Sequence, residues 1–252
     1  LNRDRAALAR YAKWFAWDGA LRDDPRTVPL LYPNRFETEG WNGPEKRPLF
    51  CVLVASNKAL TVVDPRDQYQ ARVRILDWYE RHAPADFHLF GRGWDRPAAL
   101  PGRWGRVRNQ FRKILARWMP AKSPYATWRG PVDDKIELLT RARFCLAHEN
   151  CRDLEGYVTE KLFDAFRAGC VPVYVGPKEI GDLVPSGCFI DGRAYETPAA
   201  LDAFLRTIDD AAYRGYQERI RAFLLSAQAK PFSQDHFADV LAREILADLS
   251  AR

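Results

Sequence analysis

Short apolar runs alternate with amphipathic stretches along most of the chain after residue 48. The run Leu49–Ala55 is apolar at every position, which is typical of a parallel strand buried on both faces. Similar runs predict strands at residues 87–90, 125–129, 144–147, 171–175 and 188–190. Helical spacing predicts helices at residues 67–82, 133–141, 158–168, 199–209, 211–226 and 233–249. This alternation predicts an α/β fold, a doubly wound parallel sheet.

The first 48 residues follow a different pattern. Residues 4–14 have helical spacing, residues 14–17 predict a strand, and residues 18–26 predict a polar turn region. A stretch rich in Pro, Gly and Asn runs from Pro33 to Pro48, and we expect it to be a linker. The chain begins with Leu1 and its single methionine is Met119, so we expect it to be part of a longer protein.

The positive charge of the chain is concentrated in one segment. Seven Lys and Arg residues and no Asp or Glu lie between Gly102 and Lys122. The formal net charge of the whole chain is +6, so the remainder is close to neutral. A protein that binds nucleic acid through a broadly basic surface has a different distribution of charge, and we expect no nucleic acid as a partner.

The same segment has an apolar stripe with helical spacing. Its members are Trp104, Val107, Phe111, Ile114, Leu115 and Trp118. The stripe can dock the helix on the rest of the domain, or it can lie in a membrane interface beside anionic lipids. Periodicity alone does not show what covers an apolar face, so both interpretations stay open. Peripheral membrane contact through residues 102–122 is a hypothesis at this point.

Cysteine and histidine usage gives no indication of a disulfide framework or a zinc site. The five cysteines include no CxxC spacing, and the four histidines are far apart. Cys51, Cys145 and Cys170 lie in or beside apolar runs, and we expect them to be small core residues. No apolar run reaches the roughly 18 residues of a membrane-spanning helix, and no secretory signal pattern opens the chain. These features predict a cytoplasmic location, with the inner membrane as the surface for any peripheral contact.

The densest cluster of chemically active side chains lies between His148 and Lys161. It leaves a predicted buried strand, crosses a polar loop and enters a helix, whose free N-terminal N–H groups favour an anion. Lys161 adds a cation and Tyr157 a phenol. Glu160 and Asn150 suit ribose hydroxyls or the edge of a base.

Arg129 ends another predicted strand, and its planar guanidinium fits a diphosphate in the same crevice. The chain has neither a P-loop nor a GxGxxG fingerprint. The residues alone therefore predict a phosphorylated-ligand site made from strand ends, side chains and a helix start. In the alternative interpretation these are ordinary residues: Glu160 and Lys161 in a first helical turn, Arg129 a surface charge and Asn150 a turn former.

Three consecutive segments resemble the signature of the α-1,3/1,4-fucosyltransferases, glycosyltransferase family 10. They are FCLAHEN at residues 144–150, GYVTEKL at 156–162 and AGCVPVYVGP at 168–177. Weaker similarity lies at residues 55–57, 69–72, 90–91, 128–132 and 186–190, so the resemblance extends over residues 46–195.

The resemblance implies a GT-B-type glycosyltransferase, in which the C-terminal of two Rossmann-like domains binds GDP-fucose and the other recognises the acceptor. We expect residues 46–230 to be the GDP-sugar-binding domain and residues 231–252 a C-terminal helix. Residues 1–45 would be a remnant of the acceptor domain and its linker, so that the N-terminal domain is largely missing.

The resemblance also implies roles for individual residues. Arg129 and Lys161 would bind the diphosphate and neutralise the charge that develops on it. Glu160 would hold the ribose, Asn150 would contact the nucleoside, and Tyr157 would touch phosphate or fucose. The implied GDP-fucose site as a whole consists of Asn57, Arg72, Arg129, Glu149, Asn150, Tyr157, Glu160 and Lys161. Glu149 would anchor the loop.

Two features depart from the family pattern. His148 stands where Phe or Tyr is usual, and the loop from Asn150 to Tyr157 is slightly longer than in many members.

Inverting transfer also needs a carboxylate that takes the proton of the acceptor hydroxyl. The family's catalytic Glu belongs to the N-terminal domain, and we expect it upstream of Leu1. Because Arg and Lys supply positive charge and no DxD triplet is present, we expect no metal or other cofactor.

The sequence thus predicts an inverting transferase that moves fucose from GDP-fucose to a hydroxyl of a glycan acceptor through an α-1,3/1,4 linkage. Surface-glycan or lipopolysaccharide synthesis is the expected context. Two alternatives stay open: a related transferase that uses another nucleotide sugar, and a non-catalytic module that binds sugar nucleotides or membranes.

Overall fold

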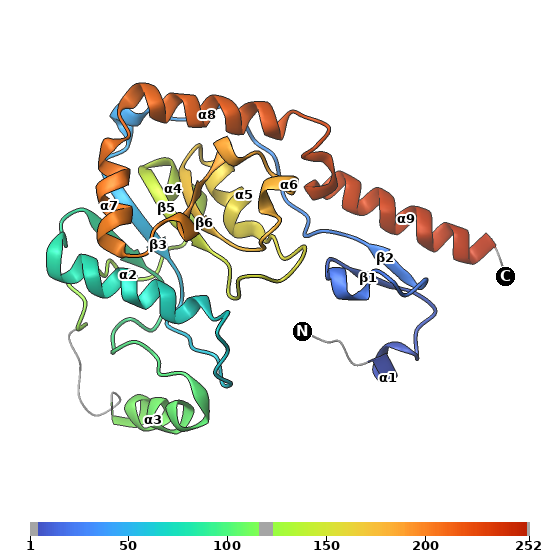
Figure 1. The fold of residues 1–252 in the computed structure, drawn as a ribbon, viewed down its shortest axis with the longest axis horizontal. Coiled ribbons are helices and arrows are strands. Elements are labelled where there is room, and N and C mark those ends of the chain that lie inside the picture. The colour runs from blue at the N-terminus through green and yellow to red at the C-terminus, as the bar shows by residue number, and fades with distance from the viewer. Residues whose placement is uncertain (1–4, 116–122, 251–252) are drawn as a thin grey trace.

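A computed structural model describes residues 5–115 and 123–250, and this part of the chain contains a five-stranded parallel sheet. The sheet has the order β4-β3-β5-β6-β7, and every neighbouring pair is parallel. Its strands are β3 (Leu49–Val54), β4 (Phe87–Phe90), β5 (Ala142–His148), β6 (Val171–Val175) and β7 (Ile190–Asp191). The sheet crosses the centre of the molecule in Figure 1.

Helices cover both faces of this sheet (Figure 1). They are α2 (Gln68–His82), α4 (Lys135–Thr140), α5 (Glu160–Arg167), α6 (Ile180–Leu183), α7 (Pro198–Thr207) and α8 (Asp210–Leu224). Alternate residues of β3 separate into two cores: Val52 packs with α4, α5 and α6, whereas Cys51 and Leu53 pack with α2 and α7. Successive side chains of a strand point to opposite faces, so the two cores lie on opposite sides of the sheet. The predicted doubly wound α/β fold is confirmed.

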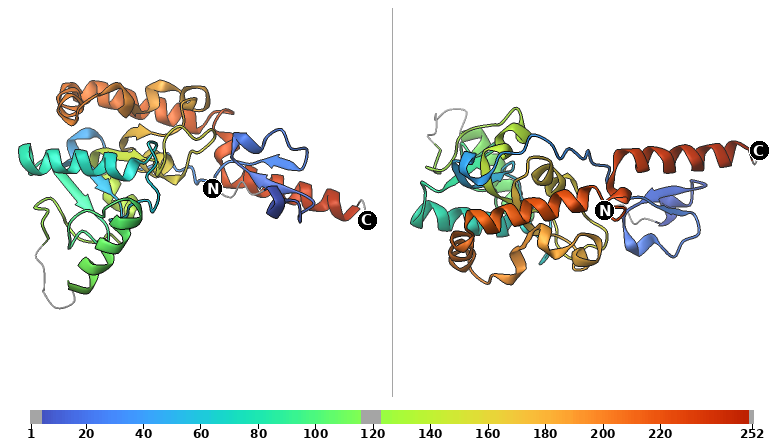
Figure 2. Two further views of the ribbon diagram at one scale, coloured as in Figure 1. Left: turned by 60° about the horizontal axis from the view of Figure 1, so that its bottom comes forward. Right: turned by 90° about the horizontal axis from the view of Figure 1, so that it is seen from above.

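The N-terminal segment lies beside the C-terminal helix, away from the sheet (Figures 1 and 2). It consists of α1 (Arg5–Leu8) and a small parallel sheet of β1 (Trp14–Ala16) and β2 (Thr27–Pro29). The C-terminal helix is α9 (Gln234–Ser250). Lys13 joins the two parts through ion pairs to Glu244 at 3.0 Å and Asp248 at 2.8 Å.

Short 3-10 turns complete the described structure, at Gly19–Leu21, Pro44–Lys46, Ser186–Cys188, Gly192–Ala194 and Lys230–Phe232. No helix among the described residues is long and apolar enough to cross a bilayer. Cys51, Cys145 and Cys170 are buried free thiols, as expected.

Three predicted elements were wrong in extent or kind. The helix predicted at residues 4–14 ends at Leu8 in α1, and its first residue lies outside the described residues. The strand predicted at 188–190 begins only at Ile190, because Cys188 ends a 3-10 turn. Residues 125–129 form no strand: only Trp128 makes a bridge, to Leu89. The backbone N–H groups of residues 126 and 127 donate to the side chain of Glu80. In a strand, these groups would take part in hydrogen bonds to a neighbouring strand.

The expected linker is irregular but firmly attached to the sheet domain. Trp41 Nε1 donates to the carbonyl oxygen of Arg167 at 2.7 Å. Arg47 is only 3% exposed. Its guanidinium donates to the carbonyl oxygens of Leu139, Ala142 and Ala168 at 2.6–2.9 Å. These bonds satisfy buried carbonyl groups where α4, β5 and α5 meet.

Candidate active site

Several predicted site residues follow strands β3 and β5, between which the chain order of the sheet reverses. From β3 the chain passes through α2 to β4 on one side, and β5 then pairs on the other side of β3. In open α/β sheets, ligands bind beyond the carboxyl ends of the strands at such a switch point. The segment Glu149–Asn150 follows β5 at this edge, and Ala55–Asn57 follows β3.

Glu149 is fully buried and organises the start of α5. Its Oε1 accepts hydrogen bonds from Thr159 N at 2.8 Å and Tyr174 Oη at 3.2 Å. Its Oε2 accepts from Thr159 Oγ1 at 2.8 Å and Lys161 Nζ at 3.0 Å. Burial and the nearby Glu149 charge raise the pKa of Tyr174, which keeps this phenol a donor. The loop-anchoring role expected for Glu149 agrees with these four bonds.

Lys161 lies in the first turn of α5 with 19% of its side chain exposed. Its Nζ also donates to Thr159 Oγ1 at 2.8 Å, and it lies 3.6 Å from Glu160 Oε1. The carboxyl ends of β3 and β5 border a small pocket that Lys161 lines together with Arg72 and Lys135. Two carboxylates offset part of this positive charge: Glu149 is paired with Lys161, and Asp164 Oδ2 accepts from Lys135 Nζ at 2.8 Å. The remaining positive charge favours an anionic ligand.

Arg72 and Asn150 connect α2 with the loop after β5. Arg72 is 6% exposed, lies 4.6 Å over the ring of Tyr69 and places Nη2 3.5 Å from Asn150 Oδ1. Burial lowers the pKa of its guanidinium. Gln68 N donates to Asn150 O at 3.0 Å. The structure therefore brings Arg72, Asn150 and Lys161 to one edge of the sheet.

Glu160 is exposed at the start of α5. Partial burial of its carboxylate opposes ionisation, but the charge of Lys161 and further hydrogen bonds outweigh this and lower the pKa. Glu160 is therefore an ionised acceptor, which suits a pair of ligand hydroxyls.

Tyr157 belongs to an aromatic cluster that the sequence did not indicate. Its ring lies 4.8 Å from that of Trp17 and 6.1 Å from that of Tyr32. The three rings line a cavity of about 510 Å³ together with Asp64 and Arg66. Burial raises the pKa of Tyr157, so its hydroxyl stays protonated at neutral pH.

A second cavity of about 510 Å³ shares Asp64 and lies beyond the ends of β5, β6 and β7. It is lined in part by Gln68, Arg152, Val175 and Tyr195. Both cavities have the size of small-ligand sites.

Arg129 and Asn57 do not join the Lys161 cluster. Arg129 is exposed beyond the edge strand β4, where Nη1 donates to Ala126 O at 2.7 Å and Nε to His88 Nδ1 at 3.3 Å. Asn57 holds a neighbouring loop: it donates to Gly93 O at 2.8 Å and accepts from Ala99 N at 2.7 Å.

His148 fills the position where the family has an aromatic ring. It is 4% exposed, and neither ring nitrogen has a hydrogen-bond partner among the residues that the structure describes. Burial, with a smaller effect of Arg72, lowers its pKa to about 3. His148 is therefore a neutral ring, and it lines the cavity beyond the ends of β5, β6 and β7.

Sequence reasoning missed Thr159, Tyr174 and Lys135. Thr159 stands at the N-cap of α5, directly before the Glu–Lys pair, and this position was the available signal. Tyr174 lies within the signature segment at residues 168–177 but was given no role there. Nothing local marks Lys135, because it reaches the site through the packing of α4. Within the described ranges, no group of three His, Cys, Asp or Glu side chains could hold a metal ion.

Comparisons with known proteins relate this chain to fucosyltransferases. Residues 118–239 match the family model of the glycosyltransferase family 10 (fucosyltransferase) C-terminal region. Alpha-(1,3)-fucosyltransferase 4 of Mus musculus is 33% identical over 167 residues, which cover 64% of this chain and 31% of that protein. Alpha-(1,4)-fucosyltransferase of Arabidopsis thaliana is 36% identical over 94 residues, 36% of this chain and 23% of that protein. The chain thus spans a third or less of these relatives.

A solved structure of alpha1,3-fucosyltransferase with GDP-fucose superimposes with a TM-score of 0.51 at 17% identity, covering 92% of this chain and 68% of that one. This likeness supports the expected GT-B-type fold. The motif from Glu149 to Lys161 lies inside the matched residues 118–239, at the switch point of the sheet. Residues 118–239 are thus similar to the C-terminal region of glycosyltransferase family 10, the fucosyltransferases, in agreement with the resemblance of the three signature segments.

Proposed function

We propose that this chain is the donor-binding part of an inverting fucosyltransferase that uses GDP-fucose. One observation carries the proposal: buried Glu149 fixes Lys161 beside Arg72 and Lys135 within the residues that match the family model. The positive charge of these side chains favours a phosphate group beyond the strand ends.

The chemistry of transfer suits this arrangement. The bond between fucose C1 and the β-phosphate oxygen breaks, and its electron pair leaves with GDP, so negative charge grows on the diphosphate. The acceptor oxygen forms the new bond to C1 from the opposite face and gives its proton to a base. Cations held in place are most effective where charge develops. We therefore assign Lys161 and Arg72 to the diphosphate and Glu160 to the ribose, and we propose that no metal or other cofactor takes part.

Two roles implied by the family resemblance, that of Arg129 at the diphosphate and that of the general base, involve groups outside the Lys161 pocket. Arg129 would have to turn from His88 and Ala126 to reach the diphosphate. The general base is proposed to be a Glu of the N-terminal acceptor domain.

For the glycan acceptor we propose the aromatic cavity of Trp17, Tyr32 and Tyr157. Apolar rings with a few polar groups at their rim are typical of small-ligand sites, and Asp64 and Arg66 supply those polar groups here. The proposed linkage is α-1,3 or α-1,4, as in the names of the two relatives. Cytoplasmic synthesis of a surface glycan or lipopolysaccharide is the proposed context.

Calorimetric titration with GDP-fucose, GDP-mannose and UDP-galactose tests the donor assignment. We expect saturable binding of GDP-fucose that weakens about tenfold or more in Lys161→Ala, because a charge-assisted bond to phosphate is lost. Lys178→Ala is the matched control, since Lys178 is an exposed lysine beyond β6. Equal affinity of both variants would contradict the role of Lys161. Preference for the UDP sugar would favour a related transferase.

A further inference from the structure

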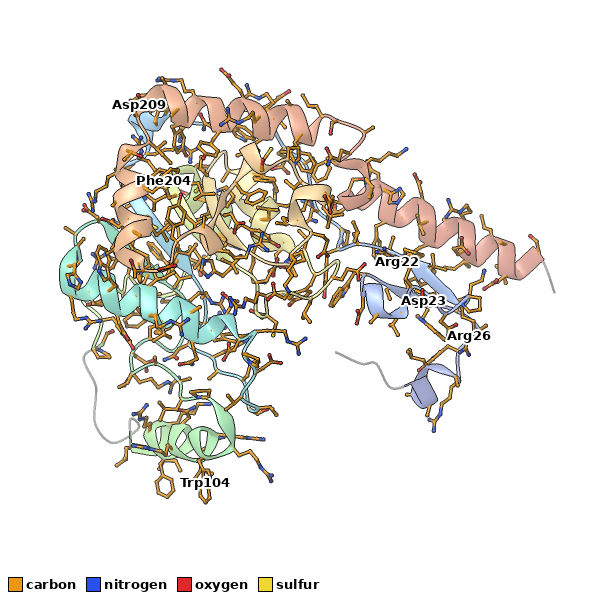
Figure 3. All side chains as sticks on the ribbon, in the orientation of Figure 1. Arg22, Asp23, Arg26, Trp104, Phe204 and Asp209 are labelled. Atoms are coloured by element: carbon orange, nitrogen blue, oxygen red, sulfur yellow. The ribbon has the colours of Figure 1, made fainter. Side chains whose placement is uncertain are left out.

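Helix α3 (Gly102–Leu115) has an apolar face that the described part of the molecule leaves uncovered. The exposed fractions are 83% for Trp104, 48% for Val107, 65% for Phe111 and 57% each for Ile114 and Leu115. Spacings of three and four residues place these side chains on one face. Figure 3 shows Trp104 pointing away from the rest of the molecule. Trp118, the last member of the predicted stripe, lies outside the described residues.

A different face attaches α3 to the domain. Gly105 is buried, and a Cβ there would collide with the carbonyl oxygen of Leu100. Asn109 Oδ1 accepts from Leu100 N at 3.1 Å, and Asn109 Nδ2 donates to Leu100 O at 2.9 Å. Arg112 Nη1 donates to Ala98 O at 3.4 Å. The interpretation that the apolar stripe docks the helix is therefore wrong for residues 102–115.

Basic side chains border the uncovered face. With about 100° between successive residues of a helix, Arg103 and Arg108 fall on its two sides. Three further cations, Arg106, Arg112 and Lys113, lie farther around α3, and the helix contains no acidic residue. Apolar and aromatic side chains between flanking cations are typical of a helix in the plane of a membrane interface. The charge is complementary to anionic headgroups.

We propose that α3 docks this protein on an anionic lipid bilayer. Trp104, Phe111 and Ile114 enter the boundary between headgroups and acyl chains, and Arg103 and Arg108 contact the headgroup phosphates. This contact is independent of the donor site, because none of these residues lines the Lys161 pocket.

Vesicle sedimentation tests the proposal. We expect vesicles of phosphatidylcholine with phosphatidylglycerol to retain the protein, and retention to fall as salt rises. Trp104→Ser/Phe111→Ser should weaken retention at least about tenfold, because the buried apolar area is lost. Ile245→Ser/Leu249→Ser is the matched control: these side chains of α9 are 54% and 62% exposed, but that helix has four acidic residues and one basic residue. The control should bind like the parent protein.

Several outcomes would overturn the proposal. Equal retention by vesicles of pure phosphatidylcholine would show that binding does not depend on anionic headgroups. If the Trp104/Phe111 variant has the helix content of the parent protein by circular dichroism, unchanged retention would show that α3 does not bind the vesicles. A lipid-free dimer in sedimentation equilibrium that this variant dissociates, without vesicle binding, would make the face a self-association surface instead.

Discussion

The carboxylate of Glu149 and the ammonium group of Lys161 lie 3.0 Å apart across the start of α5. Glu149 is fully buried, and three other donors from Thr159 and Tyr174 complete its hydrogen bonding. Lys161 is therefore held in place before any ligand arrives. Such preorganisation spares the reorganisation that a mobile lysine would need as charge develops on a leaving group.

Replacing Glu149 by Gln should lower the free energy of unfolding by about 3 kcal/mol, because it removes the buried charge partner of Lys161. Urea unfolding measures the loss. Glu155→Gln is the matched control in the same loop, since the Glu155 side chain is 52% exposed and pairs with Arg22 at 3.3 Å. Its effect should stay within about 0.5 kcal/mol. Similar losses in the two variants would contradict the anchoring role of Glu149.

Stability should depend on pH through His148. Its pKa in the folded protein is about 3, below the usual 6.5, so the unfolded chain binds the proton more readily between these values. The free energy of unfolding therefore falls as pH is lowered from 6.5, approaching about 1.4 kcal/mol per pH unit from this group. Denaturation at pH 6.5 and 5 measures the slope.

His148→Phe should flatten that pH dependence, because Phe fills the same space without a titrating group. His82→Gln should leave it unchanged, because His82 is exposed on α2. A slope that survives in His148→Phe would assign the pH dependence to other groups.

Gly156→Ala should destabilise the protein more than Gly40→Ala. Both glycines have positive φ, 75° and 71°, so both substitutions incur about 1–2 kcal/mol of backbone strain. A Cβ at Gly40 meets open space, whereas one at Gly156 collides with the carbonyl oxygen of Trp17. Urea unfolding of both variants isolates the contact between the N-terminal segment and the donor-site loop. Equal losses would show that this contact adds nothing.

The pattern of the sequence predicted most of the sheet, and it identified the loop and helix start that form the candidate site. Continuous apolar runs such as Leu49–Val54 report burial on both faces, which is a local property of a central parallel strand. The segment from Glu149 to Lys161 was identified for the same reason, because a strand end, a loop and a helix start are contiguous in the chain. Residues 125–129 were misread, because their apolar character does not reveal that Glu80 takes their backbone donors.

The sequence by itself determined the α/β class, the family signature and the residues at the start of α5, since each depends on neighbours along the chain. Only the tertiary structure decided that Arg72 and Lys135 join Lys161 while Arg129 lies beyond the edge strand. It also decided that α3 attaches through Gly105 and Asn109 and leaves Trp104 uncovered. Helical periodicity defines which residues share a face, but the partner of that face is set by packing between segments distant in sequence.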